Sequence, residues 1–126
     1  ILGRPNVGKS SLFNKLTKSR NAIVSDFSGL TKDRNFGYIK IKNKQYLVID
    51  TGGVGSEVTE FSEAITEQAL IAAEDSNLIL LLIDGSEELT ADDINLLQTI
   101  RELNKPFLVV LNKTVSLFYI LVKHWL

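Results

Sequence analysis

Two continuous apolar runs stand out in the pattern of hydrophobic and polar positions. Leu78 to Ile83 is apolar throughout and ends at Asp84-Gly85, and a second run covers Phe107 to Leu111. Runs of this length without alternation are typical of strands that are buried on both faces of a parallel sheet. We therefore expect two neighbouring parallel strands here.

A helix is predicted between these two strands. Ile94, Leu97 and Ile100 recur at helical spacing, so we expect them to face the core. Thr90 is the predicted N-cap, and Asp93 follows three residues later, as in a capping box. A second helix is predicted up to about Asp75, where small apolar residues recur at Ile65, Ala69, Ala72 and Ala73.

A hairpin is predicted in the first half of the chain. Phe36 to Lys42 and Gln45 to Asp50 are rich in β-branched and aromatic residues around an Asn43-Lys44 turn, so they should pair antiparallel. Ala22 to Val24 is a short extended segment, and Ser25 to Asn35 has no period and is predicted to be a loop. Strands that alternate with helices indicate an α/β fold, with a mostly parallel sheet flanked by helices.

Composition narrows the class of protein. The chain has 126 residues, enough for one domain, and its 44% hydrophobic and 23% charged residues are typical of a globular protein. The net charge of −1 gives no general signal for nucleic acid. The lack of cysteine excludes disulfides and fits a reducing cytoplasm, and no apolar run is long enough to cross a membrane.

The segment from Gly3 to Ser10 fits the P-loop template G-x-x-x-x-G-K-[ST]. In that template backbone N–H groups surround phosphate oxygens, the lysine contacts the terminal phosphates and the hydroxyl binds magnesium. Ile1-Leu2 precedes it as a short strand, and a predicted helix follows from Ser11, which places the loop at a helix N-terminus that favours anions. We expect Lys9 and Ser10 to supply the charge and the magnesium ligand.

Further magnesium and phosphate contacts are predicted outside the P-loop. Asp50 ends a strand before Thr51-Gly52-Gly53, and ligands of open α/β sheets bind outside the carboxyl ends of strands. Asp50 is placed to hold magnesium, and the Gly53 N–H to contact a γ-phosphate. Thr31 in the long loop is a candidate for a second magnesium-binding hydroxyl. A plain turn at Asp50 to Gly53 and a surface threonine at Thr31 remain the alternatives.

Four other polar residues receive structural interpretations. Arg4 and Arg34 are interpreted as solvated surface charges, because this is the usual state of an arginine. Asp84 precedes Gly85 and is interpreted as a turn residue. His124 is the only histidine, and a catalytic or metal-binding role for it is not expected.

Four segments together resemble the translation-factor class of GTPases. Their sequence is similar to the first G domain of the EngA/Der family, bacterial ribosome-assembly GTPases with two tandem G domains. The segments are Gly3 to Ser10, Thr31-Lys32-Asp33-Arg34, Asp50-Thr51-Gly52-Gly53 and Asn112-Lys113. The resemblance implies a P-loop NTPase fold of the Ras-like G-domain type.

This resemblance also implies roles for single residues. Thr31 would be the switch I threonine, Asp50 and Gly53 would belong to the D-x-x-G element, and Asn112-Lys113 would open the guanine-recognising N-K-x-D motif. The implied function is Mg²⁺-dependent hydrolysis of GTP to GDP and phosphate, in the cytoplasm, during assembly of the large ribosomal subunit. The implied nucleotide-binding residues are Gly3, Arg4, Pro5, Asn6, Val7, Gly8, Lys9, Ser10, Ser11, Asp50, Thr51, Gly52, Gly53, Asn112 and Lys113.

A potassium ion is implied as a second cation. Val54 follows Gly53 at the position where many small GTPases have a glutamine that orients the attacking water. This resembles GTPases with a hydrophobic substitution, several of which bind potassium near the P-loop, and Asn6 matches their potassium-binding asparagine. The implied catalytic set is Asn6, Lys9, Thr31 and Gly53.

The end of the chain departs from the family pattern. The fourth position of N-K-x-D is Val115, and 115–126 is an apolar tail unlike the family, so we interpret 1–114 as a partial G domain, incomplete at both ends. Three functions stay open. The first is a GTPase, and the second is a nucleotide-binding or interaction fragment with impaired guanine selectivity and no significant turnover. The third, an ATPase of the P-loop class, is disfavoured by Asn112-Lys113.

Overall fold

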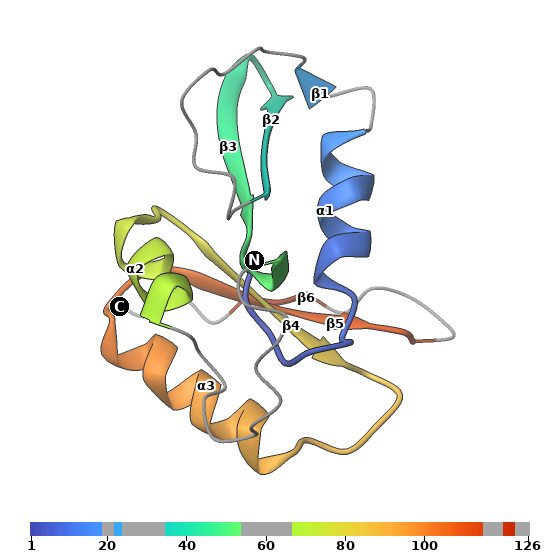
Figure 1. Ribbon diagram of the computed structural model, residues 1–126, viewed down its shortest axis with the longest axis vertical. Coiled ribbons are helices and arrows are strands. Elements are labelled where there is room, and N and C mark those ends of the chain that lie inside the picture. Colours follow the sequence, from blue (N-terminus) through green and yellow to red (C-terminus); the bar gives the residue numbers. More distant parts are fainter. Residues whose placement is uncertain (19–21, 24–34, 54–66, 115–119, 123–126) are drawn as a thin grey trace.

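A computed structural model gives the structure of residues 1–18, 22–23, 35–53, 67–114 and 120–122. Helices and strands are mixed along the chain, so the predicted α/β class is confirmed (Figure 1). The elements in chain order are α1 (Lys9–Thr17), β1 (Ala22–Ile23), β2 (Asn35–Ile41), β3 (Lys44–Asp50), the short 3₁₀ helix η1 (Thr51–Gly53), α2 (Glu67–Asp75), β4 (Ile79–Asp84), α3 (Ala91–Glu102), β5 (Phe107–Asn112) and β6 (Ile120–Val122).

The predicted hairpin is present, with its turn one residue earlier than expected. β2 and β3 pair antiparallel with Ile41 opposite Lys44, and β1 pairs antiparallel with the other edge of β2. The turn residues Lys42 and Asn43 have φ of 47° and 67°. Positive φ at both central residues is the geometry of a type I′ turn, whose twist matches that of the flanking strands. The predicted Asn43-Lys44 turn is therefore wrong, because Lys44 already belongs to the strand.

Ile1 and Leu2 lie between β3 and β4 and connect the two sheets. The amine of Ile1 donates to the Ile49 carbonyl at 2.7 Å, and the Leu2 N–H donates to the Leu80 carbonyl at 2.8 Å. The Leu82 N–H donates back to the Leu2 carbonyl at 2.7 Å. This two-residue segment therefore occupies a central position, directly before the P-loop.

β4 and β5 form the parallel part of the fold. They pair in register from Ile79 opposite Phe107 to Asp84 opposite Asn112. The exposed Leu78, predicted to open the first apolar run, precedes the strand. β6 pairs antiparallel with the other edge of β5, so antiparallel pairings flank a parallel centre. Of the predicted apolar tail only 120–122 lies within the described residues.

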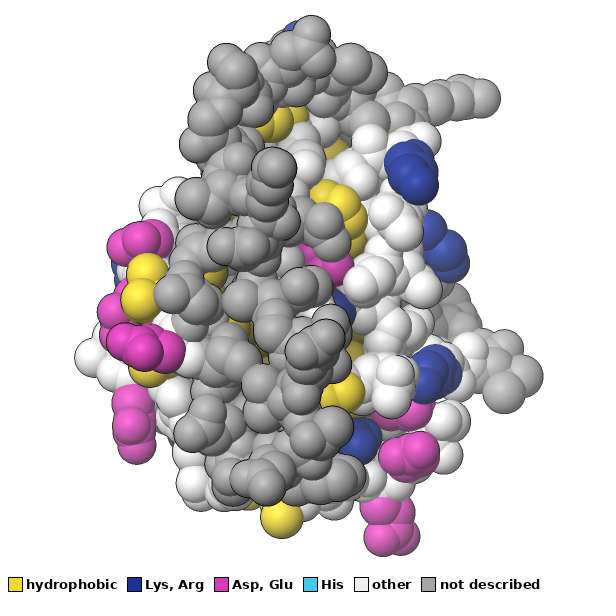
Figure 2. Space-filling model, in the orientation of Figure 1, with side chains coloured by type: hydrophobic (Ala, Val, Ile, Leu, Met, Phe, Trp, Pro, Cys, Tyr) yellow, Lys and Arg dark blue, Asp and Glu magenta, His cyan; other side chains and the backbone are white. Residues whose placement is uncertain are grey.

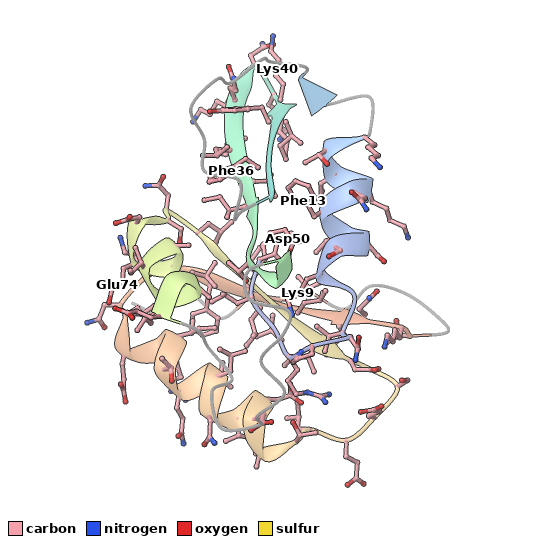
Figure 3. The ribbon with its side chains drawn as sticks, viewed as in Figure 1. Lys9, Phe13, Phe36, Lys40, Asp50 and Glu74 are labelled. Atoms are coloured by element: carbon pink, nitrogen blue, oxygen red, sulfur yellow. The ribbon has the colours of Figure 1, made fainter. Side chains whose placement is uncertain are left out.

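The helices lie on two sides of the strands. Figure 1 shows α1 beside the β2–β3 hairpin, and α2 and α3 on the other side, along β4 and β5. At Gly37 the hairpin approaches α1 so closely that a Cβ would lie 2.8 Å from the Cβ of Thr17. Phe13 of α1 points toward the hairpin and is buried (Figure 3). The main core joins α2, α3, β4, β5 and Leu2 through Leu2, Ala69, Ala73, Ile79, Leu81, Ile83, Leu96, Ile100 and Phe107.

The buried face of α3 differs from the predicted one. Ile100 is fully buried, as expected, but Ile94 is 46% exposed, so its predicted burial is wrong. Leu96 and the charged Asp93 are buried instead. Residues 93, 96 and 100 follow helical spacing, so the face of α3 that meets the core includes Asp93. A search for apolar residues alone does not find this face, because Asp93 is charged.

Charged side chains gather in several places on the face shown in Figure 2. Figure 2 shows Lys and Arg side chains along the α1 edge of the molecule, and acidic side chains over α2 and beside the connection from β4 to α3. Among the residues that the structure describes, no helix combines the length and apolar character needed to cross a lipid bilayer.

Ile100 and Ile94 test the assignment of the α3 face, because one substitution can be made at both positions of the same helix. We expect Ile100→Ala to lower the free energy of unfolding by about 2–5 kcal/mol, since it removes fully buried methyl groups and leaves a cavity. Ile94→Ala should change it by less than about 1 kcal/mol. Urea unfolding followed by circular dichroism measures both, and equal losses would contradict the assigned face.

Candidate functional site

The P-loop connects residue 2 to α1 and has two residues with positive φ. Asn6 has φ of 66°, and Gly8, the N-cap of α1, has φ of 103°. Asparagine and glycine are the residues that adopt this conformation most readily. A Cβ at Gly8 would also collide with the side-chain amide of Asn112. Glycine is therefore required at this position by both backbone geometry and space.

Lys9 is the first residue of α1, and its ammonium group returns to the loop. The Nζ atom donates to the carbonyls of Gly3 and Arg4, each at 2.7 Å. Burial lowers the pKa of the Lys9 ammonium, and the neighbouring Asp50 carboxylate opposes this shift. The predicted phosphate-binding lysine therefore lies inside the loop, with its charge partly withdrawn from solvent.

Ser10 and Asp50, both predicted to be magnesium ligands, are in direct contact. The Ser10 hydroxyl donates to Oδ2 of Asp50 at 3.0 Å, and the Gly52 N–H donates to Oδ1 at 2.9 Å. Asp50 is fully buried at the end of β3, and Figure 3 shows it next to Lys9. A hydroxyl and a carboxylate oxygen are hard ligands of the type that Mg²⁺ takes together with substrate phosphates. The donors present therefore fit a magnesium ion.

Asn112 and Lys113 contact the opposite arm of the P-loop. The amide of Asn112 donates to the Val7 carbonyl at 2.8 Å. Lys113 Nζ donates to the Asn6 carbonyl at 2.6 Å. Two motifs that lie more than 100 residues apart in the chain are thus in direct contact.

Asp84 does more than the predicted turn residue. Its Oδ1 accepts the Ser86 N–H at 2.9 Å, which confirms the turn, but its Oδ2 also pairs with Lys113 Nζ at 3.2 Å. The hydrogen bonds from Ser86, with a smaller effect of Lys113, lower the pKa of Asp84 to about 2. The interpretation as a turn residue alone is therefore incomplete, because this buried carboxylate also orients Lys113.

Arg4 is not the solvated charge that the sequence predicts. Its side chain is 18% exposed, and its Nε donates to Oδ1 of the buried Asp93 at 2.8 Å. A second nitrogen lies 3.5 Å from the exposed Glu87 carboxylate. The hydrogen bond with Asp93 raises the pKa of Arg4. Burial alone would raise the pKa of Asp93, but hydrogen bonds from Thr90 and Arg4 together lower it.

The remaining predicted residues form two groups, and those of the first group lie within the described part of the chain. Thr51 donates its hydroxyl to the Ile1 carbonyl at 2.7 Å, Gly53 ends η1, and Pro5 and Ser11 are exposed in and after the loop. The second group lies outside the described residues and consists of Thr31, Arg34, Val54, Val115 and His124.

Sequence reasoning missed the roles of two aspartates, Asp84 and Asp93. The strand-end position of Asp84 and the capping box of Asp93 were visible. The sequence does not show that Lys113 and Arg4 are their partners, because no local pattern connects residues so far apart. Arg4 and Asp93 are separated by 89 positions in the chain.

Comparison with known families identifies the family of the chain. The family model described as a 50S ribosome-binding GTPase matches residues 1–113. The chain belongs to this family. The G-domain fold expected from the motifs is thereby confirmed.

Curated relatives point to the same group. The chain is 45% identical over 114 residues to GTPase Der of Legionella pneumophila (strain Lens), which covers 90% of this chain and 25% of that protein. It has the same identity and coverage of this chain with GTPase Der of Glaesserella parasuis serovar 5, and spans 23% of that relative. The chain thus spans about a quarter of the length of these relatives, and the predicted similarity to Der is confirmed.

Two solved structures share the fold. A variant of Aquifex aeolicus Era bound to GDP and AlF4⁻ matches with a TM-score of 0.65 and 35% identity, over 89% of this chain and 38% of that one. The G domain of the FeoB iron transporter from T. maritima matches with a TM-score of 0.57 and 29% identity, over 86% of this chain and 66% of that one.

The lowered pKa of Asp84 predicts an acid-sensitive contribution to stability. Its pKa rises from about 2 in the folded chain to the ordinary 3.8 on unfolding, so the ionised form favours folding. This contribution is present above about pH 4 and is lost as the pH falls toward about 2. We expect Asp84→Asn to lose less stability than the parent chain over that interval, in urea titrations at successive pH values. Ser86→Ala should fall between them, and identical pH profiles for all three would contradict the assignment.

Proposed function

We propose that this chain binds Mg²⁺ and GTP at the P-loop and hydrolyses GTP to GDP and phosphate. The observation that supports it is the meeting of Lys9, the Ser10–Asp50 pair and Asn112-Lys113 around one loop. This arrangement occurs in a chain that belongs to a GTPase family. Since the chain spans only part of its relatives, the activity is proposed for the site described and not for a longer protein.

The binding step uses the loop and the start of α1. The N–H groups at a helix N-terminus, with the helix dipole, favour a phosphate anion. Lys9 has three N–H donors, and two of them contact the Gly3 and Arg4 carbonyls, so a third remains for a phosphate oxygen. Ser10 and Asp50 would hold magnesium, which neutralises charge on the β- and γ-phosphates when bound.

Hydrolysis requires a water molecule to attack the γ-phosphorus while the bond to the β-phosphate oxygen breaks. GDP leaves with the bridging oxygen, inorganic phosphate takes the oxygen of the water, and the protons of the water pass to phosphate oxygens or to solvent. Charge stabilisation and positioning provide most of the catalysis in such reactions. Lys9 supplies the positive charge, Gly53 is proposed to donate its N–H to the γ-phosphate, and Thr31 is proposed as the second hydroxyl ligand of magnesium.

Guanine recognition is proposed through Asn112 and Lys113. The amide of Asn112 and the half-exposed side chain of Lys113 lie beside the loop, where the base of a bound nucleotide would follow its phosphates. Val115 at the fourth motif position favours a second candidate, a nucleotide-binding fragment with impaired guanine selectivity and no significant turnover. Competition between nucleotides and phosphate release distinguish the two functions.

We also propose a potassium site and a cellular role. The side chain of Asn6 is exposed at the loop, where its amide oxygen is available as a cation ligand. The family description as 50S ribosome-binding GTPases supports a role with the large ribosomal subunit in the cytoplasm.

The nucleotide site is tested by titration of the chain with fluorescent GDP and magnesium. We expect saturable binding with a Kd of roughly micromolar, displaced by GDP and not by ADP. Lys9→Ala should weaken binding by roughly 100-fold, because it removes charge-assisted contacts to phosphate. Lys15→Ala is the matched control, since Lys15 is exposed on the same helix. Displacement by ADP as strong as by GDP would support the second candidate, and equal affinity of Lys9→Ala and parent would overturn the site.

The potassium site is tested by phosphate release from magnesium and GTP in potassium or sodium chloride at equal ionic strength. We expect release to be roughly tenfold faster in potassium, equivalent to about 1.4 kcal/mol of barrier. Asn6→Gly should abolish this difference, because glycine tolerates the positive φ and lacks the amide ligand. A potassium effect that survives in Asn6→Gly would rule out Asn6 as the ligand.

A further inference from the structure

Arg4 connects two parts of the molecule through different atoms. Its main-chain carbonyl accepts a hydrogen bond from Lys9 Nζ at 2.7 Å. Its guanidinium Nε donates to Oδ1 of Asp93 at 2.8 Å. The residue that holds the phosphate-binding lysine is therefore itself held by the first turn of α3.

Asp93 is a rigid partner for this contact. Its side chain is 1% exposed, and its Oδ2 accepts both the N–H and the hydroxyl of Thr90 at 3.0 Å. Thr90 in turn accepts the Asp93 N–H in a complete capping box. One carboxylate oxygen is thus fixed by the helix cap, and the other is directed at the P-loop. Glu87 is a weaker partner of Arg4, because it is 57% exposed and 3.5 Å away.

We propose that Asp93 is a positioning residue of the nucleotide site, which acts through Arg4 to hold the Lys9 ammonium where it meets the terminal phosphates. This role rests on the proposed function. Asp93 does not touch the nucleotide. It fixes the guanidinium, which limits movement of the main chain at Arg4 and keeps one of the two carbonyl acceptors of Lys9 in place.

The physical consequence of removing the Asp93 charge is specific. In Asp93→Asn the amide oxygen can still accept from Thr90, but the amide nitrogen then faces the Arg4 donor, and two donors cannot bond to each other. Arg4 loses its buried partner, and Lys9 loses a fixed acceptor. GDP and GTP, whose terminal phosphates are proposed to meet Lys9, should then bind less tightly.

The first experiment needs no nucleotide. A double-mutant cycle combines Asp93→Asn with Lys9→Met and measures the unfolding equilibrium constant in urea. If Asp93 acts on Lys9 through Arg4, the loss of Lys9 matters less once Asp93 is changed. We therefore expect the double variant to change the unfolding equilibrium constant by a factor about threefold or more smaller than the product of the two single changes. Additive effects would overturn the proposal.

A matched cycle separates positioning from helix stability. Thr90→Ala removes the hydroxyl from the same helix cap, but the main-chain N–H at position 90 still donates to Oδ2 of Asp93, and Oδ1 still faces Arg4. We expect Thr90→Ala and Lys9→Met to be additive. Equal coupling in both cycles would show that Asp93 only stabilises α3.

If Asp93→Asn does not fold by circular dichroism, Arg4→Gln replaces it, because it removes the cation and leaves the cap intact. Additivity of Arg4→Gln with Lys9→Met would overturn the proposal equally.

The second experiment measures affinity for fluorescent GDP with magnesium. We expect Asp93→Asn to weaken binding roughly tenfold, the size expected for one charge-assisted hydrogen bond. Thr90→Ala and Glu87→Gln should stay within about twofold of the parent chain. Unchanged affinity in Asp93→Asn would overturn the role in binding.

The two experiments fail independently. A parent chain that does not bind GDP would refute the proposed function, while the cycle would still decide whether Asp93 positions Lys9. Normal binding by the parent with an additive cycle would refute only the positioning role.

Discussion

Side chains hold four backbone carbonyls of the P-loop, two held by the loop's own lysine and two by a distant segment, and the site depends on this constraint. Lys9 contacts the first arm of the loop at Gly3 and Arg4. Lys113 and Asn112 contact the second arm of the loop, beyond Pro5, at the carbonyls of Asn6 and Val7. A loop whose carbonyls already have donors can direct its N–H groups to an anion, which is the basis of phosphate binding at such loops.

The parallel centre of the fold makes these contacts possible. The carboxyl ends of parallel strands meet at one edge of a sheet, which is where ligands of α/β proteins bind. β4 ends at Asp84 and β5 at Asn112, and these two residues are paired in register. Leu2 lies beside β4 and leads directly into the loop. Side chains from three segments of the chain therefore reach the loop without long connections, and the antiparallel hairpin brings Asp50 to the same place.

The sequence predicts the parts of the site that follow from local patterns. The P-loop template, the strand-end position of Asp50 and the capping box at Thr90 are all local, and each is present in the structure. The sequence predicts the hairpin turn one residue too late, because the turn residues Lys42 and Asn43 lack the Asn-Gly pattern that indicates a type I′ turn. Ile94 was assigned to the core because residues 94, 97 and 100 fit a helical face as well as 93, 96 and 100 do. Tertiary contact decides between the two faces. Asp93 is buried because Arg4 meets it, and a hydrophobic pattern counts an aspartate as exposed.

The buried Asp84 and Asp93, one at each arm of the loop, show why the other contacts of the site are not predictable from the sequence. An ionised carboxylate is costly to bury unless it is paired with a cation and hydrogen-bonded. Asp84 satisfies this condition with Ser86 and Lys113, and Asp93 satisfies it with Thr90 and Arg4. In each case one oxygen is bound by a neighbouring turn or cap, which local sequence reveals, and the other is bound by a cation from a remote segment. Each aspartate thus joins an element of the core to the P-loop. Because the same groups contribute to folding and to the geometry of the loop, the stability of α3 and of the end of β4 is linked to the site where phosphate is expected to bind.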